Sequence, residues 1–189
     1  KKRAAQTVAK LDKASESSPI IVLEPSCLAT LYDDFPDLLD DENVCRKVTD
    51  RIVSLEQFLI QPDIAQALKN KIKKVPERIL LHGHCQHKAL FGMSPASEAL
   101  SCLGGTDLTV LDAGCCGMAG SFGYEKEHYE ISEQIGEDRL FPAIREVKNE
   151  TTIVASGFSC RAQISHFTNR NAVHLAEVLA GALEEVSTK

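Results

Sequence analysis

The sequence predicts an α/β fold in three layers, with a parallel sheet covered by helices on both faces. The first observation is that short runs rich in apolar and β-branched residues recur at residues 20–23, 79–81, 108–111 and 152–155. Such runs are typical of strands buried on both faces. The second observation is that segments with helical periodicity separate these runs. Regular alternation of strands and helices favours parallel pairing with helices on both sides.

The helices are predicted in order from apolar spacing and from terminal residues. Residues 1–15 place Ala4, Val8 and Leu11 on one face, which predicts an amphipathic helix. Proline suits the first turn of a helix, and Pro62 begins one such segment. A long helix over residues 125–147 is expected to kink at Pro142. The other predicted helices cover residues 28–39, 43–60, 62–74, 94–103 and 173–186.

Composition excludes several functional classes. The net charge of −6 argues against a nucleic-acid partner, and no apolar run reaches the length of a transmembrane segment. The chain has seven cysteines, an odd number, without the close spacing of a small disulfide-bonded scaffold. Unpaired thiols persist in a reducing compartment, so we expect the protein to be cytoplasmic.

Cysteines follow each of the four predicted strands. Cys27, Cys85, the adjacent pair Cys115 and Cys116, and Cys160 occupy the loops or helix starts after these strands. Because the carboxyl ends of parallel strands meet at one edge of a sheet, we expect these thiols to converge. Thiolates are ligands for Zn²⁺ and for iron–sulfur clusters. Cys45 and Cys102 fall inside predicted helices and are expected to be packing residues.

The thiols have two alternative roles that the residues alone leave open. The cysteines could be buried structural thiols, or Cys115 and Cys116 could form a redox pair. The chain contains no C-x-x-C motif, which excludes the bacterial ferredoxin pattern and the zinc ribbon on spacing. His82, His84 and His87 surround Cys85 and could supply a nitrogen ligand or a proton, or could only cap secondary structure. His84 is the strongest candidate of the three.

An internal similarity links two parts of the chain. Residues 20–31 (IIVLEPSCLATL) and 152–164 (TIVASGFSCRAQI) share an apolar run, a short turn, a Ser-Cys pair and a helix start. Glu24 in the first segment falls where Gly157 falls in the second. The pattern predicts a duplicated half-domain.

Three motifs together resemble the cysteine-rich CCG domain family. They are HGHCQHKAL, beginning at His82, DAGCCG, which contains Cys115, and GFSCRAQI, which contains Cys160. The family includes the B subunit of heterodisulfide reductase, the glycolate oxidase iron–sulfur subunit and the anaerobic glycerol-3-phosphate dehydrogenase C subunit. The resemblance covers residues 20–179. Over these residues the chain strongly resembles the C-terminal part of fused FAD-linked oxidases of the D-lactate or D-2-hydroxyglutarate dehydrogenase type.

The resemblance implies a domain organisation and a ligand set. Residues 1–18 would be a helix left from a truncated first CCG repeat, residues 19–78 the end of that repeat with connecting helices, and residues 79–189 a complete second repeat. The implied metal ligands are Cys85, Cys115, Cys116, Cys160 and, from the preceding repeat, Cys27. Gly117 completes the CCG motif, whereas Gly157 replaces the first cysteine of the family's closing C-x-x-C. The implied surroundings of the ligands are Gly117, Gly157, His82, His84 and His87.

The resemblance also implies a function. The cofactor would be an iron–sulfur cluster of the [4Fe–4S] type or zinc, with FAD in the N-terminal part of a parent protein. The domain would pass electrons from the flavin and ferredoxin-like domains to an acceptor such as a quinone or an electron-transfer protein, in the cytoplasm or at the inner face of the membrane. By itself it is not expected to be catalytically active. The alternative is a zinc-bound or metal-free module that docks the other domains.

Overall fold

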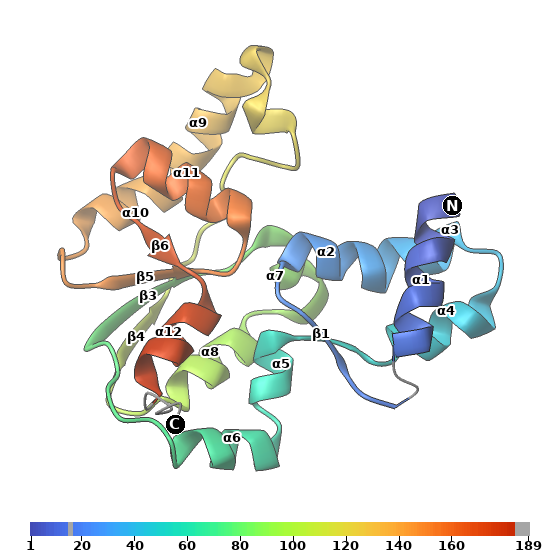
Figure 1. Cartoon of the computed structure of the whole chain (residues 1–189). Helices are drawn as coiled ribbons and strands as arrows, with labels where there is room; N and C mark the ends of the chain where they lie inside the picture. Colours follow the sequence, from blue (N-terminus) through green and yellow to red (C-terminus); the bar gives the residue numbers. More distant parts are fainter. Residues whose placement is uncertain (15–16, 184–189) are drawn as a thin grey trace, which may run out of the picture.

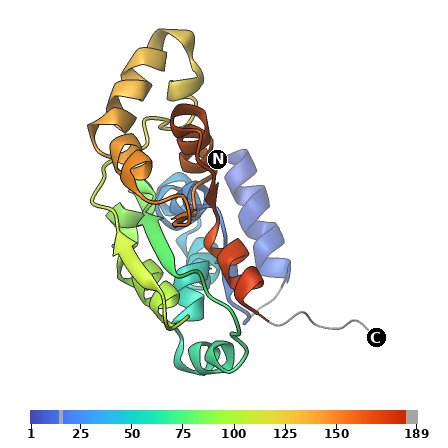
Figure 2. The same cartoon turned by 90° about the vertical axis from the view of Figure 1, so that its left-hand side faces the viewer.

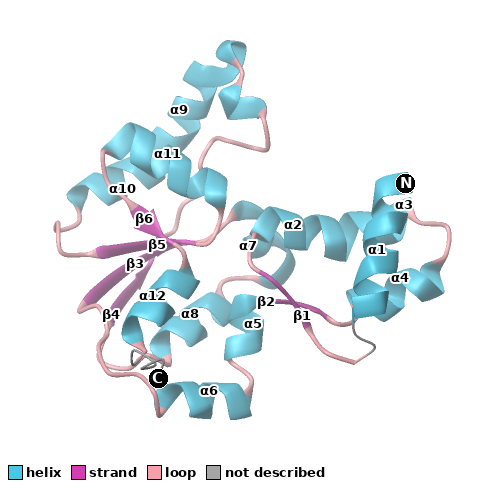
Figure 3. Ribbon diagram, in the orientation of Figure 1, coloured by secondary structure: helices cyan, strands magenta, loops and turns pink. Residues whose placement is uncertain are grey.

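The computed structural model describes residues 1–14 and 17–183 and has helices packed on parallel sheets (Figures 1 and 3). One sheet pairs β1 (Ile20–Val22) with β2 (Ile52–Ser54). The other has the order β4-β3-β5-β6, formed by Asp107–Val110, Arg78–His82, Thr152–Ala155 and Ala172–Val173. All strand pairs within the two sheets are parallel. The α/β class is confirmed, but the first predicted strand belongs to a separate sheet.

The first part of the chain forms its own small core around β1 and β2. Val8, Leu28, Val48 and Ile52 are buried against one another there. The elements that surround this sheet are α1 (Lys2–Ala14), α2 (Pro25–Ala29), the π-helical turn η1 (Thr30–Asp34), α3 (Phe35–Leu38) and α4 (Glu42–Thr49). The predicted helix at residues 28–39 is therefore present but starts at Pro25.

The prediction of a single helix over residues 43–60 was wrong, because β2 lies within this segment. The strand separates α4 from α5 (Leu55–Leu59). Ile52 is buried and pairs with Ile20, so tertiary pairing of β-branched residues overrides the helical spacing. Ser54 then starts α5 with a capping box, in which its side chain accepts from the Gln57 N–H and the Gln57 side chain accepts from the Ser54 N–H.

Helices lie on both faces of the four-stranded sheet (Figure 1), and a buried core lies between each helical layer and the sheet. Ile79 and Leu81 of β3 face one core, whereas Leu80 faces the other, as expected for alternating side chains. The first face packs against α5, α8 (Ser94–Ser101) and α12 (Leu175–Ala182); the second packs against α10 (Leu140–Glu146) and α11 (Phe158–Thr168). The predicted three-layer arrangement is confirmed for this sheet.

The remaining elements connect these layers. They are α6 (Pro62–Lys69), α7 (Cys85–Phe91), η2 (Phe122–Tyr124), η3 (Lys126–His128) and α9 (Tyr129–Asp138). The region from η2 to α9 extends beyond the sheet in both views (Figures 1 and 2). No helix within the described ranges is long and apolar enough to cross a membrane.

Two further helix predictions need correction. The helix expected over residues 125–147 starts at Tyr129 and breaks at Arg139, not at Pro142. Pro142 lies in the first turn of α10. The N–H groups of a first turn have no acceptor within the helix, so a proline there costs no hydrogen bond. The helix expected from residue 173 starts at Leu175, because Val173 pairs with Val154 in β6. Its expected end, residues 184–186, lies outside the described residues, as does residue 15 of the first helix.

The strand order brings three loops together. The chain leaves β3 for β4 on one side and then crosses to β5 on the other side of β3. A reversal of this kind opens a crevice at the carboxyl ends of the strands, where α/β folds commonly bind ligands. The loops after β3, β4 and β5 are the ones that lead to Cys85, Cys115 and Cys160.

Candidate metal centre

Four of the five predicted ligand cysteines come from these three strand ends. Cys85 is the first residue of α7, Cys160 lies in the first turn of α11, and Cys115 and Cys116 lie in the loop after β4. Cys116 and Cys160 are buried, whereas Cys85 and Cys115 are partly exposed. All seven cysteines are free thiols. Neither strained pairing of Cys115 with Cys116 nor any other disulfide is present.

The four sulfurs contact one another in series. Cys115 accepts hydrogen bonds from the Cys116 and Cys85 thiols, which lower the pKa of Cys115 well below the usual thiol range. Cys160 is the alternative acceptor for the single Cys116 proton, and this interaction also holds the pKa of Cys160 well below that range. The same bonds, with burial, raise the pKa of Cys85 and of Cys116. The site therefore favours thiolates at Cys115 and Cys160, the form in which cysteine binds metals.

The CCG loop is locked against α9 and α11. The Gly117 N–H donates to the Cys115 sulfur at 3.4 Å. Gly117 has φ of +96°, and a Cβ there would lie 2.1 Å from the Ser132 carbonyl oxygen, so only glycine fits. The buried Gln163 side-chain amide donates to the Cys116 carbonyl at 3.0 Å and to the Ser132 hydroxyl at 2.8 Å.

Two cationic side chains near the cysteines donate hydrogen bonds to backbone carbonyls of the strand-end loops. The Lys88 ammonium donates to the carbonyls of Ala113 and Gly114, just before Cys115. The Arg161 guanidinium donates to the Ala155 carbonyl at 2.9 Å and to the Ser156 carbonyl at 2.7 Å. Both residues follow a cysteine of the site closely in the sequence, Lys88 by three positions and Arg161 by one. The sequence does not indicate which carbonyls they bind.

The three histidines are buried beside the thiols. His82, His84 and His87 are 1%, 7% and 4% exposed. His82 lies close enough to Cys160 to lower the pKa of that thiol. The His87 Nε2 lies 4.0 Å from the Glu56 carboxylate, and burial lowers the pKa of His87.

Several ring nitrogens lack hydrogen bonds. Both nitrogens of His82, Nδ1 of His84 and Nε2 of His87 are buried without a hydrogen-bond partner in the described part of the chain. Unpaired buried polar atoms call for a physical cause, and one is an ion that they surround. Thiolates and unpaired imidazoles together form a donor set that fits a soft metal centre. Among residues 1–14 and 17–183, however, no three acidic, cysteine or histidine side chains are grouped so as to hold one metal ion.

Cys27 occupies a different position. It lies in α2 and is exposed, outside the series of contacts among the other four thiols. The loop before it nevertheless abuts the site: Glu24 accepts from the Phe158 N–H at 3.0 Å, and the His174 ring contacts the Leu23 carbonyl at 3.1 Å. Ligation by Cys27 stays a prediction. Glu24, the counterpart of Gly157 in the internal similarity, binds the start of α11.

Two residues near the site were missed. Gln163 stands three positions after Cys160, on the same helix face, and this spacing could have identified it. Glu56 is a buried carboxylate that accepts from the Ser156 hydroxyl at 2.8 Å and faces His87. No local signal marks Glu56, because its partner is 100 residues away.

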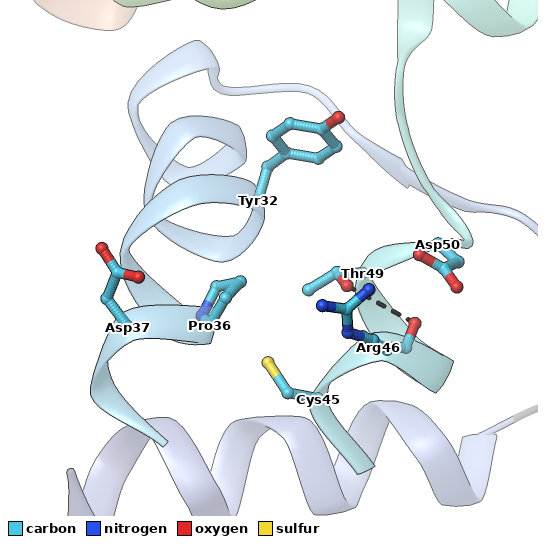
Figure 4. Close-up of a pocket in the computed structure, with 7 residues that line it drawn as sticks. All are labelled: Tyr32, Pro36, Asp37, Cys45, Arg46, Thr49 and Asp50. Carbon is cyan, nitrogen blue, oxygen red and sulfur yellow. Dashed lines mark hydrogen bonds between the residues drawn. The ribbon is translucent and has the colours of Figure 1, made fainter. Parts of the chain in front are cut away.

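A separate hollow lies in the first part of the chain, between η1, α3 and α4 (Figure 4). Its lining comes only from residues 32–50: Tyr32, Pro36, Asp37, Cys45, Arg46, Thr49 and Asp50. The Cys45 side chain is buried, as expected for a packing residue, and burial raises its pKa. This hollow contains none of the candidate ligands.

Comparisons with known proteins match the part of the chain that forms the thiol site. A family model described as "Cysteine-rich domain", CCG, matches residues 79–165. The chain is 30% identical to the C subunit of anaerobic glycerol-3-phosphate dehydrogenase of Escherichia coli K12, over 87% of this chain and 40% of that protein. It is 28% identical to D-2-hydroxyglutarate dehydrogenase of Haemophilus influenzae, over 88% of this chain and 16% of that protein.

A third relative is matched over more of its own length. Lactate utilization protein A of Macrococcus caseolyticus is 22% identical over 94% of this chain and 74% of that protein. The chain spans only about two fifths of the first of these relatives and about one sixth of the second. Residues 79–165, which carry the four clustered cysteines, match the model of the cysteine-rich CCG domain family.

Proposed function

We propose that the chain is an electron-transfer domain that binds an iron–sulfur cluster. The observation that carries the proposal is the meeting of Cys85, Cys115, Cys116 and Cys160 from three strand ends, with sulfurs in contact and unpaired imidazoles beside them. A bound cluster would supply one-electron transfer. A [4Fe–4S] cluster takes one thiolate on each of its four irons, so its ligands need not surround a single metal ion.

The chain's own residues would prepare and protect these ligands. The Gly117 N–H bond to the Cys115 sulfur stabilises negative charge on it and so favours ligation. Gln163, Lys88 and Arg161 fix the loops through backbone carbonyls, which orients the thiols before a metal arrives. Burial of Cys116 and Cys160 excludes water from the inner side of the site.

We further propose the setting of this electron transfer. The first two relatives are dehydrogenase proteins. We therefore assign the chain to an FAD-linked 2-hydroxy-acid oxidoreductase of the cytoplasm or the inner membrane face. A flavin domain and a ferredoxin-like domain would deliver electrons, and a quinone or an electron-transfer protein would accept them. The cluster type we expect is [4Fe–4S].

The test is the metal content of protein purified and reconstituted without oxygen. Matched iron and sulfide, with a brown colour that bleaches on reduction, is the expected result. The alanine variants of Cys85, Cys115, Cys116 and Cys160 should each lower the iron content, whereas Cys102→Ala, at the end of α8, should not. Stoichiometric zinc without iron would replace the proposal with a structural metal site. Protein that takes up neither metal would refute it.

A further inference from the structure

We propose that His84 is a nitrogen ligand of this centre, with its ring in the space that Gly157 leaves open. The inference rests on the proposed function and deepens it, because it names a ligand of a different chemical type. The resemblance implied cysteine at position 157, and this chain has glycine there. The question is which side chain occupies the place of the absent thiol.

The answer is a contact between two strand-end loops. A Cβ built on Gly157 would lie 2.3 Å from Cδ2 of His84 and 3.2 Å from the Cys160 sulfur. The His84 ring thus lies where any side chain at position 157 would begin, next to a sulfur of the thiol series. Glycine at position 157 and the ring of His84 are therefore complementary, since the ring could not lie there beside a larger residue.

His84 is buried but neither caps a helix nor makes a hydrogen bond through Nδ1. His84 is the residue before α7, but its side chain makes no capping hydrogen bond. Its Nδ1 is buried and has no partner among the residues that the structure describes. A buried unpaired nitrogen costs free energy, and a metal bond to the ring would offset that cost.

The neighbouring histidines fit other tasks. The His87 Nε2 points to the Glu56 carboxylate, 4.0 Å away, and so lies toward α5 and not toward Gly157. His82 is at the end of β3, and its ring is close to the Cys160 sulfur. A ring in that position suits a hydrogen bond to a ligand sulfur, which tunes a centre without joining it. Of the three rings, that of His84 fills the space at Gly157.

Ligation by imidazole has a chemical consequence. A neutral imidazole in place of a thiolate removes one negative charge from the centre. In iron–sulfur proteins, histidine in place of cysteine raises the reduction potential. We therefore expect a centre that accepts electrons more readily than one with cysteine in the same place.

The experiment is pulsed electron paramagnetic resonance on the reduced, iron-reconstituted chain with ¹⁵N-labelled histidine. Wild type should show a coupling of the cluster spin to histidine nitrogen that changes with the label. In His84→Ala this coupling should disappear, and iron should be lost to a chelator about tenfold faster. The surface variant His166→Ala should leave the coupling unchanged, and His82→Ala, which removes a neighbour of the Cys160 sulfur and not the proposed ligand, should retain a nitrogen coupling.

A second variant restores a thiol and guards against misfolding. Gly157→Cys combined with His84→Ala should recover iron retention, without nitrogen coupling and with a lower reduction potential than wild type. Gly157→Cys alone should bind iron poorly, because the new side chain collides with the His84 ring.

The outcomes separate the two proposals. Wild type with full iron and sulfide but no coupling to histidine would overturn the role of His84 and leave the cluster intact. Coupling that persists in His84→Ala and vanishes in His82→Ala would overturn it in favour of His82. Wild type that takes up no iron and sulfide would overturn the proposed function, and this inference with it.

Discussion

Two strand–turn–helix units of the molecule share a local pattern and use it differently. In the first, β1 leads through Glu24 to α2, which contains Cys27; in the second, β5 leads through Gly157 to α11, which contains Cys160. Glu24 and Gly157 are both the residue just before the helix, in extended conformation. Yet Cys27 is exposed, whereas Cys160 is 2% exposed.

The difference shows that packing partners, not the local motif, decide what a strand-end cysteine does. Around Cys160, the CCG loop and the histidines close over the sulfur, and glycine at position 157 leaves room for a ring. At the first unit a carboxylate occupies the equivalent place and reaches across to the Phe158 N–H. One unit forms the inside of the site, and the other supports it from outside.

The largest expected effect compares the two equivalent cysteines. Cys160→Ala should lower the iron occupancy of anaerobically reconstituted protein about tenfold, because it removes a buried ligand from the series. Cys27→Ala should leave most of the iron in place. Iron and sulfide analysis of both variants beside wild type is the measurement. An equal loss in the two variants would place Cys27 among the ligands and show that its exposure is misleading.

The second effect concerns the glycine loop, which the first unit lacks. Gly117→Ala should lower the free energy of unfolding by about 3 kcal/mol, because its Cβ would collide with the Ser132 carbonyl in a backbone conformation that favours glycine. Gly120→Ala is the matched control: φ is +70° there too, but the Cβ would meet open space, so about 1 kcal/mol is expected. Urea unfolding measures both. Equal losses would show that backbone conformation, not the collision, fixes the loop.

The fold class was predictable because three strands of the main sheet are rich in apolar residues and alternate with helical segments. The strands at residues 79–81, 108–111 and 152–155 are present within one or two residues, and their shared edge is as expected. β2 was not predictable, because Ile52 and Val53 stand within a helical spacing and become a strand only by pairing with β1. β6 is two residues long and likewise depends on its neighbour.

The site residues that directly follow predicted strands could be identified from the sequence. Those that join the site through contacts with residues far along the chain could not. Cys85, Cys115, Cys116 and Cys160 meet because parallel strands share an edge. The contact of Glu24 with Phe158 joins residues 134 positions apart and leaves no mark in either local sequence. The ring of His84 against Gly157 is of the same kind, since a missing side chain gives no signal by itself.

A third effect tests how the first unit supports the second. Glu24→Ala should lower the free energy of unfolding by about 1 kcal/mol, the usual cost of losing a helix N-terminal acceptor. Its carboxylate accepts from both the Phe158 N–H and the Ser26 hydroxyl, so one change removes two bonds. Glu24→Gln, which keeps one acceptor oxygen, should lose less. If Glu24→Ala were as stable as wild type, the two units would be independent at this contact.

The smallest effect compares an ion pair from each region. Arg145 donates to both carboxylate oxygens of Glu137, at 2.6 and 2.8 Å, and these bonds lower the pKa of Glu137. In the first region Lys1 donates to Asp40 at 2.7 Å and lowers the pKa of Asp40, but that carboxylate is 88% exposed. A carboxyl pKa that is lower in the folded state stabilises the fold above the unfolded-state pKa, and this stability is lost as pH falls.

Glu137→Gln should therefore lower the free energy of unfolding at pH 7 by about 0.5 kcal/mol, after allowance for solvent screening, and by less at pH 3. Asp40→Asn is the matched control and should leave stability unchanged at both pH values, since water screens its charge almost fully. Thermal unfolding of the two variants and wild type at each pH is the measurement. A loss in Glu137→Gln that did not shrink in acid would mean that the side chain acts by packing on Arg145 and not by its charge. Asp40→Asn could instead lose as much stability as Glu137→Gln. The second hydrogen bond of the Arg145–Glu137 pair would then add little to stability, and the attraction between opposite charges would account for both losses.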